Sequence, residues 1–198
     1  MRALIMAGGC GSRLNLGEKP LASVCGRPMI SYVIEAFKNA GCEPVVGTSL
    51  NTPMTQNWCR AHTIPFFRSS GSGYIEDLVE TVTELEESGP LFVSVCDIPC
   101  INAECILEIL HEYSGSGLEA CSTWIPSTQV KACRESMPYR EQVDGIEACP
   151  AGINILRGDC IDRPQQELKI LLATPRLCLN INTRQDLKEA ELFIKNNP

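Results

Sequence analysis

Met1-Arg-Ala-Leu-Ile-Met-Ala-Gly-Gly-Cys-Gly-Ser-Arg-Leu-Asn-Leu-Gly-Glu-Lys-Pro20 is the stretch that decides the fold. Residues 3–7 form a short apolar run, as in a strand buried on both faces, and three of the next four residues are glycine. Glycines keep side chains away from a turn, so several backbone N–H groups can converge there on an anion such as a triphosphate. Arg13 and Lys19 add two cations. The stretch predicts a phosphate-binding loop, with a plain strand-to-helix turn as the alternative.

Two common phosphate loops do not match this stretch. A Walker A loop needs Gly-x4-Gly-Lys-Ser/Thr, and the chain contains no Lys-Ser or Lys-Thr pair. The dinucleotide-binding fingerprint needs Gly-x-Gly-x-x-Gly, but Gly9-x-Gly11 is followed by Leu14 where the third glycine belongs. The loop therefore argues against an ordinary P-loop GTPase and against a hydride-transfer enzyme.

Strand-like and helix-like segments alternate over the first 114 residues, which predicts an α/β fold with a mostly parallel central sheet flanked by helices on both faces. At 198 residues the chain suits a single domain spanning 1–198. A closing helix is predicted from Thr183, where Thr-x-x-Asp forms a capping box. The strands are predicted, from their apolar runs, at 3–7, 44–49, 64–67, 91–95, 118–126, 146–156 and 176–181.

Polar residues follow these predicted strands directly. The carboxyl ends of parallel strands meet at one edge of the sheet, where ligands bind in such folds. Asp97 comes just after the strand 91–95, and its carboxylate is a candidate Mg²⁺ ligand because Mg²⁺ prefers oxygen. A turn aspartate before a proline is the alternative. The glycine loop and the segments 48–52 and 69–73 fall at the same edge, so the sequence predicts one site there.

Composition restricts the partners and the compartment. The formal charge is −7 and no basic run occurs, which argues against a nucleic-acid partner. No apolar run approaches the ~20 residues of a membrane segment. The 12 cysteines contain no Cys-x-x-Cys pair and follow no N-terminal signal segment, so we expect reduced core thiols in a cytoplasmic protein. A homodimer is one assembly that the sequence leaves open.

Three further blocks give the chain a family resemblance. Gly-Gly-x-Gly-Ser-Arg-Leu at 8–14, with Lys-Pro six residues past the arginine, resembles the signature of nucleotidyltransferases that activate sugars, isoprenoid precursors and cofactors. Within that superfamily, the blocks Ser70-Gly-Ser-Gly-Tyr-Ile-Glu-Asp-Leu78, Pro150-Ala-Gly-Ile-Asn154 and Leu179-Asn-Ile-Asn-Thr183 resemble the archaeal GTP:adenosylcobinamide-phosphate guanylyltransferases of cobalamin synthesis. The resemblance implies a Rossmann-like nucleotidyltransferase fold and transfer of GMP from GTP to adenosylcobinamide phosphate.

The implied reaction assigns roles to residues. An acceptor phosphate oxygen attacks the α-phosphorus of GTP, so the step needs positioning and charge neutralisation. The acceptor phosphate is already ionised at neutral pH, and no general base is required. The predicted catalytic residues are Arg13 on the departing pyrophosphate, Lys19 on the α-phosphate and Asp97 on Mg²⁺. The resemblance implies that the nucleotide is bound by Ala7, Gly8, Gly9, Gly11, Ser12, Arg13, Lys19, Thr48, Asn51, Ser70 and Gly71. Thr48, Asn51 and Ser70 are the candidates that read guanine, and the resemblance favours Asn51, with a cap or turn as the alternative for each.

The second metal ligand and the acceptor site are predicted less directly. Related enzymes often place an aspartate where this chain has Asn180-Ile-Asn182, which makes Asn182 the second candidate ligand, with a turn residue as the alternative. Gly152 and Asn154 are predicted to bind the acceptor, with a strand bulge as the alternative for the glycine. Asp77, at the start of a predicted helix, is interpreted as an acidic residue that favours the positive end of the helix dipole.

Two other functions are alternatives for this sequence. A molybdenum cofactor guanylyltransferase shares the glycine loop, the Asp97-type carboxylate and the Asn-Ile-Asn-Thr ending, but the 70–78 block argues against it. A non-catalytic nucleotide-binding protein is the other alternative. The joint presence of Arg13, Lys19 and Asp97 argues against that.

Overall fold

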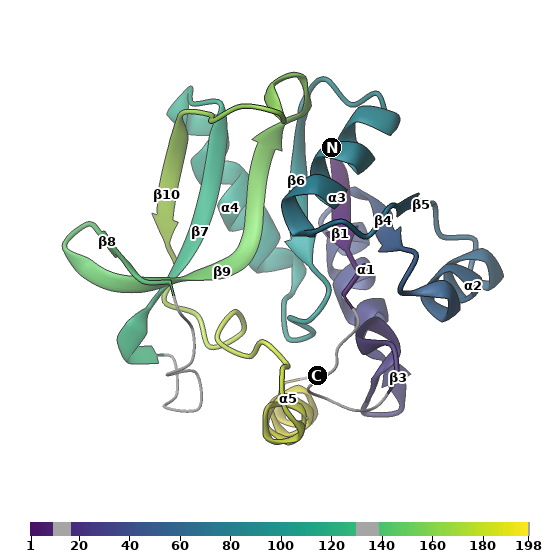
Figure 1. The fold of residues 1–198 in the computed structure, drawn as a ribbon. Helices are drawn as coiled ribbons and strands as arrows, with labels where there is room; N and C mark the ends of the chain where they lie inside the picture. The colour runs from purple at the N-terminus through teal and green to yellow at the C-terminus, as the bar shows by residue number, and fades with distance from the viewer. Residues whose placement is uncertain (10–16, 130–138, 198) are drawn as a thin grey trace.

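The computed structural model describes residues 1–9, 17–129 and 139–197, and its centre is an eight-stranded sheet (Figure 1). Its strands are β1 (Arg2–Met6), β4 (Glu43–Ser49), β5 (Phe66–Ser69), β6 (Pro90–Val95), β7 (Ala120–Pro126), β8 (Glu141–Val143), β9 (Ile146–Arg157) and β10 (Glu167–Leu171). They lie in the order β10-β7-β9-β6-β1-β4-β5, with β8 paired to β9. β9 runs antiparallel to β6, β7 and β8, and the other neighbours pair in parallel. The predicted mostly parallel sheet is confirmed.

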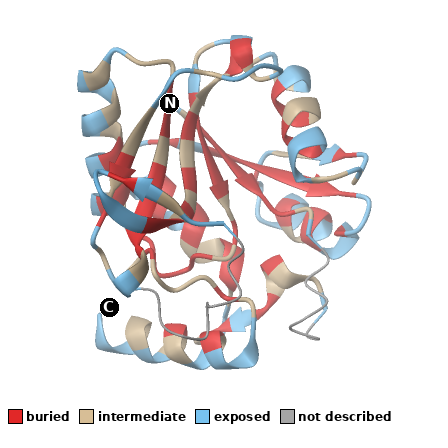
Figure 2. Ribbon diagram, turned by 60° about the vertical axis from the view of Figure 1, so that its left-hand side comes forward, coloured by how far each residue is buried: buried red, intermediate tan, exposed pale blue. Residues whose placement is uncertain are grey.

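Helices cover both faces of this sheet. The covering helices are α1 (Met29–Asn39), α2 (Pro53–Ala61), α3 (Tyr74–Glu84) and α4 (Ala103–Ser116), and a fifth helix, α5 (Arg184–Asn196), lies apart from both faces. Successive residues of β1 point to opposite faces, as the pleat of a strand requires. Ala3 and Ile5 join the large core with α1, α2 and α4, whereas Leu4 and Met6 pack against α3. Figure 2 shows the buried sheet between layers of helices that are exposed on their outer sides.

The helices begin and end where local chemistry favours it. The Asn102 side chain accepts a hydrogen bond from the Cys105 N–H and caps α4, and Gly117 ends that helix in the left-handed conformation. Thr183 and Asp186 form the predicted capping box of α5. α5 does not cover a sheet face. It packs with Val24, Met29 and Ile181 in a small separate cluster near the carboxyl edge of the sheet (Figure 1).

The prediction of a strand at 176–181 was wrong. Pro175 has no N–H to donate, and the Leu177 and Cys178 N–H groups bond back to Thr174 and Pro175 at 3.3 and 3.2 Å, so the segment turns. The last strand is instead β10, which pairs in parallel with β7. The predicted strand 64–67 forms two residues later, as β5.

The short helix η2 (Ser127–Gln129) and β8 lie between β7 and β9 in the sequence. The described residues also form a hairpin of β2 (Ser23–Val24) and β3 (Arg27–Pro28), and the short helices η1 (Lys19–Leu21) and η4 (Gly158–Cys160). None of the helices in the described ranges is long and apolar enough to cross a membrane.

Candidate nucleotide site

A cavity of about 330 Å³ opens at the carboxyl edge of the sheet. The sheet brings together residues that are far apart in sequence, because the parallel strands β1, β4, β5 and β6 all end at this edge and their following loops begin there. The predicted site residues Gly8, Gly9, Lys19, Asn51, Gly71 and Asp97 all line it. The other lining residues are Met6, Gly73, Tyr74, Asp77, Val95 and Cys96. Gly11, Ser12 and Arg13 lie outside the described residues.

Four polar side chains form a connected cluster at one end of this cavity. The Lys19 ammonium forms an ion pair with Asp97 Oδ2 and donates to Asn182 Oδ1 at 2.9 Å. Asn180 Nδ2 donates to Asp97 Oδ1 at 3.0 Å, and Asn182 Nδ2 donates to Asn180 Oδ1 at 2.7 Å. The Lys19 and Asp97 side chains are each only 14% exposed, so their opposite charges are poorly solvated and hold each other in place.

Short segments with their own anchors position this cluster. Lys19 begins η1, and Pro20 is buried beneath it. The preceding residue, Glu18, accepts hydrogen bonds from Met54 N–H at 2.7 Å and Thr55 N–H at 2.6 Å, which caps the start of α2. The Ile181 N–H bonds to the Asp97 carbonyl at 2.8 Å. This bond fixes the two flanking asparagines beside Asp97.

The cluster has the donor chemistry that a magnesium ion needs. Asp97 and Asn182 both present an oxygen toward the Lys19 ammonium, and Mg²⁺ commonly takes one or two carboxylates together with phosphate oxygens. Within the described ranges, no three His, Cys, Asp or Glu residues converge to hold a metal. The protein side chains therefore fit a cation that takes most of its ligands from a bound triphosphate, with Lys19 and the cation competing for Asp97.

The other end of the cavity is built by the loops after β1, β4 and β5. Ser49 Oγ donates to the Gly8 carbonyl at 2.8 Å and accepts from the Asn51 N–H at 3.1 Å. Asp77 Oδ1 accepts from the Gly71 N–H at 2.9 Å. The Ser49–Gly8 bond joins the loops after β1 and β4, and the Gly71–Asp77 bond holds the loop after β5 to α3. No cation lines this end within the described part of the chain.

Tyr74 and Cys96 lie in the cavity wall close to Asp97. Desolvation, and after it the negative charge of Asp97, raises the pKa of Tyr74 to about 12. The same two causes raise the pKa of the Cys96 thiol to about 12. Both groups are therefore protonated at neutral pH. Tyr74 can donate a hydrogen bond, and Cys96 is not a nucleophile.

Three predicted nucleotide-binding residues are not among those that line the cavity. Thr48 is buried and its hydroxyl donates to the Phe67 carbonyl at 2.7 Å, which joins β4 to β5. The Ser70 hydroxyl donates to Glu80 at 2.8 Å. Ala7 is buried and its N–H bonds to the Gly47 carbonyl at 2.7 Å. Each of the three holds a loop that lines the cavity, and direct contact with the nucleotide stays a prediction for them.

The predicted acceptor residues lie on β9. Gly152 has φ +81°, and a Cβ there would lie 2.7 Å from Val95 Cγ2. The register between β7 and β9 shifts at this point, which is the strand bulge given above as the alternative for Gly152. Val95 lines the cavity, so Gly152 contacts a lining residue but does not line the cavity itself. Asn154 is paired opposite Val93 and Ser122 in the sheet. Acceptor binding by these two residues stays a prediction.

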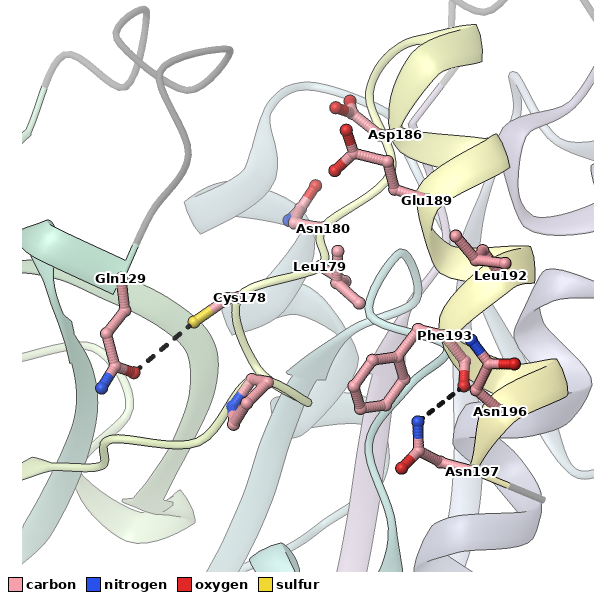
Figure 3. Close-up of a pocket in the computed structure, with 11 residues that line it drawn as sticks. Gln129, Cys178, Leu179, Asn180, Asp186, Glu189, Leu192, Phe193, Asn196 and Asn197 are labelled. Atoms are coloured by element: carbon pink, nitrogen blue, oxygen red, sulfur yellow. Dashed lines mark hydrogen bonds between the residues drawn. The ribbon is translucent and has the colours of Figure 1, made fainter.

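A second cavity, of about 470 Å³, lies between α5 and the segment 175–180 (Figure 3). Leu179, Leu192 and Phe193 give it an apolar wall, and Asn180, Asp186 and Glu189 line it as well. Asn180 belongs also to the Lys19–Asp97 cluster. The described lining residues include two carboxylates and no cation, so this cavity is poorly suited to a triphosphate.

The sequence-based prediction missed several residues of the nucleotide cavity. Gly73, Val95 and Cys96 line it through the positions of their loops, for which a single sequence gives no separate signal. Asp77 was interpreted only as a residue favourable to the helix dipole. The signal that marks it is its place six residues after Gly71, which lets the carboxylate fold back onto the loop N–H groups.

Comparisons with known proteins identify the family of the chain. Residues 3–168 match the family described as the MobA-like NTP transferase domain. The adenosylcobinamide-phosphate guanylyltransferase of Methanocaldococcus jannaschii is 32% identical over 206 aligned positions, which cover 98% of each chain. The molybdenum cofactor guanylyltransferase of Shewanella pealeana is 27% identical over 119 positions, which cover 59% of this chain and 58% of that protein.

Solved structures share the fold. A transferase from Thermus thermophilus superposes with a TM-score of 0.69 at 15% identity, covering 94% of this chain and 100% of that one. CMP:2-keto-3-deoxy-manno-octonic acid synthetase complexed with CTP superposes with a TM-score of 0.73 at 16% identity, covering 100% of both chains. The family match over residues 3–168 and the full-length relative show that the chain belongs to the MobA-like NTP transferase family and groups there with the adenosylcobinamide-phosphate guanylyltransferases.

Proposed function

We propose that the protein transfers GMP from GTP to adenosylcobinamide phosphate and releases pyrophosphate. The observation that carries the proposal is the Lys19–Asp97–Asn182 cluster at the glycine-loop cavity, where a cation and oxygen ligands face each other. A full-length relative named for this activity supports the choice of acceptor. The molybdenum cofactor relatives align over little more than half of the chain, which makes that acceptor the weaker alternative.

The chemistry needs no proton transfer. An oxygen of the acceptor phosphate forms a bond to the α-phosphorus of GTP, and the bond from that phosphorus to the α–β bridging oxygen breaks. Pyrophosphate leaves with that electron pair. Negative charge shifts onto the α-phosphate oxygens and the leaving group, so a fixed cation stabilises the transition state more than the ground state. Lys19 supplies this cation when its ammonium turns from Asp97 to the α-phosphate.

We propose Mg²⁺ as the metal, with Asp97 and Asn182 as its protein ligands. When bound, it would neutralise charge on the triphosphate oxygens. Asp97 has two roles in the proposed reaction. In the structure it holds Lys19 in place, and its carboxylate would be a ligand of the metal when metal and nucleotide are bound. We also place the reaction in a reducing compartment such as the cytoplasm, because the ten described cysteines form no disulfide.

The test is pyrophosphate release from GTP with adenosylcobinamide phosphate as acceptor. ATP, CTP and UTP serve as alternative donors, and the molybdenum cofactor as alternative acceptor. Release confined to GTP and the corrinoid acceptor is the expected result. Release with the molybdenum cofactor alone would transfer the function to that alternative. Tight GTP binding without release to either acceptor would support a non-catalytic role.

A further inference from the structure

Asp77 is a buried carboxylate in the wall of the nucleotide cavity. It lies in the first turn of α3, is only 7% exposed, and lines the cavity together with Gly8, Asn51 and Gly71. A carboxylate is costly to bury unless its oxygens are hydrogen-bonded. The way its two oxygens are used therefore indicates what the residue does.

The two oxygens have different surroundings. Oδ1 accepts hydrogen bonds from the Gly71 N–H at 2.9 Å and the Ser72 N–H at 3.2 Å, which holds the loop in front of α3. Oδ2 has no hydrogen-bond partner among the described residues. It lies 3.6 Å from the position that a Cβ would take on Gly8, at the glycine loop. One oxygen thus holds the loop, and the other keeps its acceptor capacity toward the cavity.

This end of the cavity suits a neutral group with N–H donors. The cation that would attract phosphate, Lys19, is paired with Asp97 in the cluster already described. A carboxylate would repel a triphosphate, so the phosphates belong beside Lys19 and the nucleotide base beside Asp77. The Asn51 amide also reaches this end, because its Nδ2 lies 3.2 Å from the position of a Cβ on Gly71.

We propose that Asp77 selects guanine, by accepting hydrogen bonds on Oδ2 from the N1–H and N2–H donors of the base. Adenine presents a lone pair at N1 and carbon-bound hydrogen at C2, and therefore offers this oxygen an acceptor instead of a donor. A site that leaves a buried carboxylate oxygen unpaired rejects the wrong base strongly. The inference rests on the proposed use of GTP and adds the residue that enforces it.

Asp77→Asn tests the proposal by exchanging one atom. The amide Oδ1 can still accept from Gly71 and Ser72, whereas a flipped amide would press its NH₂ group against these two N–H donors. The NH₂ group must therefore face the cavity, where it meets both the N1–H and the N2–H donors of guanine. Xanthine keeps the N1–H donor but replaces the second donor with its C2 carbonyl, which the NH₂ group can bond to. We expect GTP affinity to fall by roughly 100-fold and XTP affinity to rise above it.

The measurement is calorimetric titration of GTP, ITP, XTP and ATP into the wild-type and variant proteins without acceptor. Wild-type protein should bind ITP, which lacks the 2-amino group, at least about tenfold more weakly than GTP. Glu80→Gln is the matched control. Glu80 is another α3 carboxylate that holds the same loop, through the Ser70 N–H at 2.9 Å, but it does not line the cavity. Glu80→Gln should keep the GTP preference.

The outcomes separate this inference from the proposed reaction. A folded Asp77→Asn protein that still prefers GTP, or that weakens GTP and XTP equally, would overturn guanine selection by Asp77. Wild-type protein that binds ITP as tightly as GTP would overturn it as well. In each of these cases GTP-dependent pyrophosphate release would leave the transfer reaction intact. Selective GTP binding with the expected switch to XTP, but no transfer to acceptor, would support Asp77 and remove the proposed reaction.

Discussion

Lys19 is held by groups that it must leave in order to act on a nucleotide. In the structure its ammonium is paired with Asp97 and bonded to Asn182, and both partners are oxygens that a metal can take over. The site is thereby electrically balanced before the nucleotide arrives. In the proposed reaction, a bound triphosphate and its cation would exchange one set of ion pairs for another, so little uncompensated charge would be buried at any stage.

Lys19→Ala should lower kcat by roughly 100-fold or more while changing GTP affinity much less, because the contact to the α-phosphate strengthens in the transition state. Steady-state kinetics and calorimetry with GTP measure the two quantities. Lys169→Ala is the matched control, since Lys169 is also paired with a carboxylate, Glu141, but does not line the cavity. An unchanged kcat in Lys19→Ala would remove this residue from the chemistry.

Asp97→Asn should abolish most metal-dependent activity, because a neutral amide binds Mg²⁺ far more weakly than a carboxylate. The variant also leaves the 14%-exposed Lys19 side chain without its counter-charge, so we expect a loss of roughly 1–3 kcal/mol in unfolding free energy. Activity titrated with Mg²⁺ and urea denaturation test the two effects. Equal wild-type rates with and without Mg²⁺ would contradict the metal role.

At the residue scale, sequence reasoning works where a pattern dictates the position of a residue. Lys19 and Asp97 each follow a strand whose carboxyl end is set by the sheet, and the structure brings them together as expected. Asp77 differs from them. Its importance depends on which oxygen faces the cavity and on the loop that bonds to the other, and a single sequence carries neither fact.

Among the helices, α2 is held by Glu18, the residue directly before Lys19. Besides the Met54 and Thr55 N–H groups, the Glu18 carboxylate accepts from the Thr55 hydroxyl at 2.6 Å. Thr52, at the N-cap, makes no capping bond with its side chain. A residue from another segment thus supplies the cap, and the residue after it is Lys19.

Glu18→Ala should therefore lower the unfolding free energy by about 1–2 kcal/mol and raise the KM for GTP, since it frees the Lys19 segment from α2. Thermal denaturation and steady-state kinetics measure the two effects. Glu35→Ala is the control, because Glu35 forms an exposed ion pair with Arg27 that should contribute about 0–1 kcal/mol. A Glu18→Ala protein with unchanged KM would show that α2 does not position Lys19.

The turn after β9 has no room for a side chain. A Cβ on Gly158 would lie 1.8 Å from the Glu87 carbonyl oxygen, so Gly158→Ala must move backbone and should cost at least about 3 kcal/mol. Gly115, near the end of α4, has no atom within 4 Å of its Cβ position. Gly115→Ala should therefore stabilise the helix by up to about 1 kcal/mol. Urea denaturation of both variants tests the opposite signs.

Strand prediction succeeded where apolar runs are flanked by clear turns and failed at the end of the chain. The runs at β10 and at 176–181 have similar lengths and apolar content, but the second begins in a turn at Pro175 and has no strand partner in the described part of the chain. β10 pairs with the edge of β7. The segment 176–181 instead bonds to Asp97, through the Asn180 side chain and the Ile181 N–H. Strand formation depends on the neighbouring strand more than on the segment itself.

For the molecule as a whole, the buried thiols make stability depend on pH. Burial raises the pKa of Cys59 to about 11 and of Cys96, Cys100 and Cys121 to about 12. The folded state therefore favours the neutral thiols. This contribution is complete below the ordinary thiol pKa near ~9 and is lost as pH rises toward the folded values.

We expect the unfolding free energy to decrease steadily above pH ~9, as unfolded thiols ionise and folded ones do not. Urea denaturation between pH 7 and pH 10.5, under reducing conditions, gives the slope. Cys121→Ala should have a shallower slope because it removes one of these thiols, which is 1% exposed. Val93→Ala is the control, since Val93 is also 1% exposed but carries no ionisable group. Identical slopes in all three proteins would refute the thiol contribution.

The antiparallel position of β9 has a consequence for synthesis on the ribosome. β1, β4, β5 and β6 can pair as soon as the first hundred residues have emerged, but the other edge of β6 waits for residues 146–157. Until then the backbone of Leu91, Phe92 and Val93, all buried in the finished protein, presents an open strand edge. A nascent chain stalled before β9 should therefore be the form most dependent on chaperones.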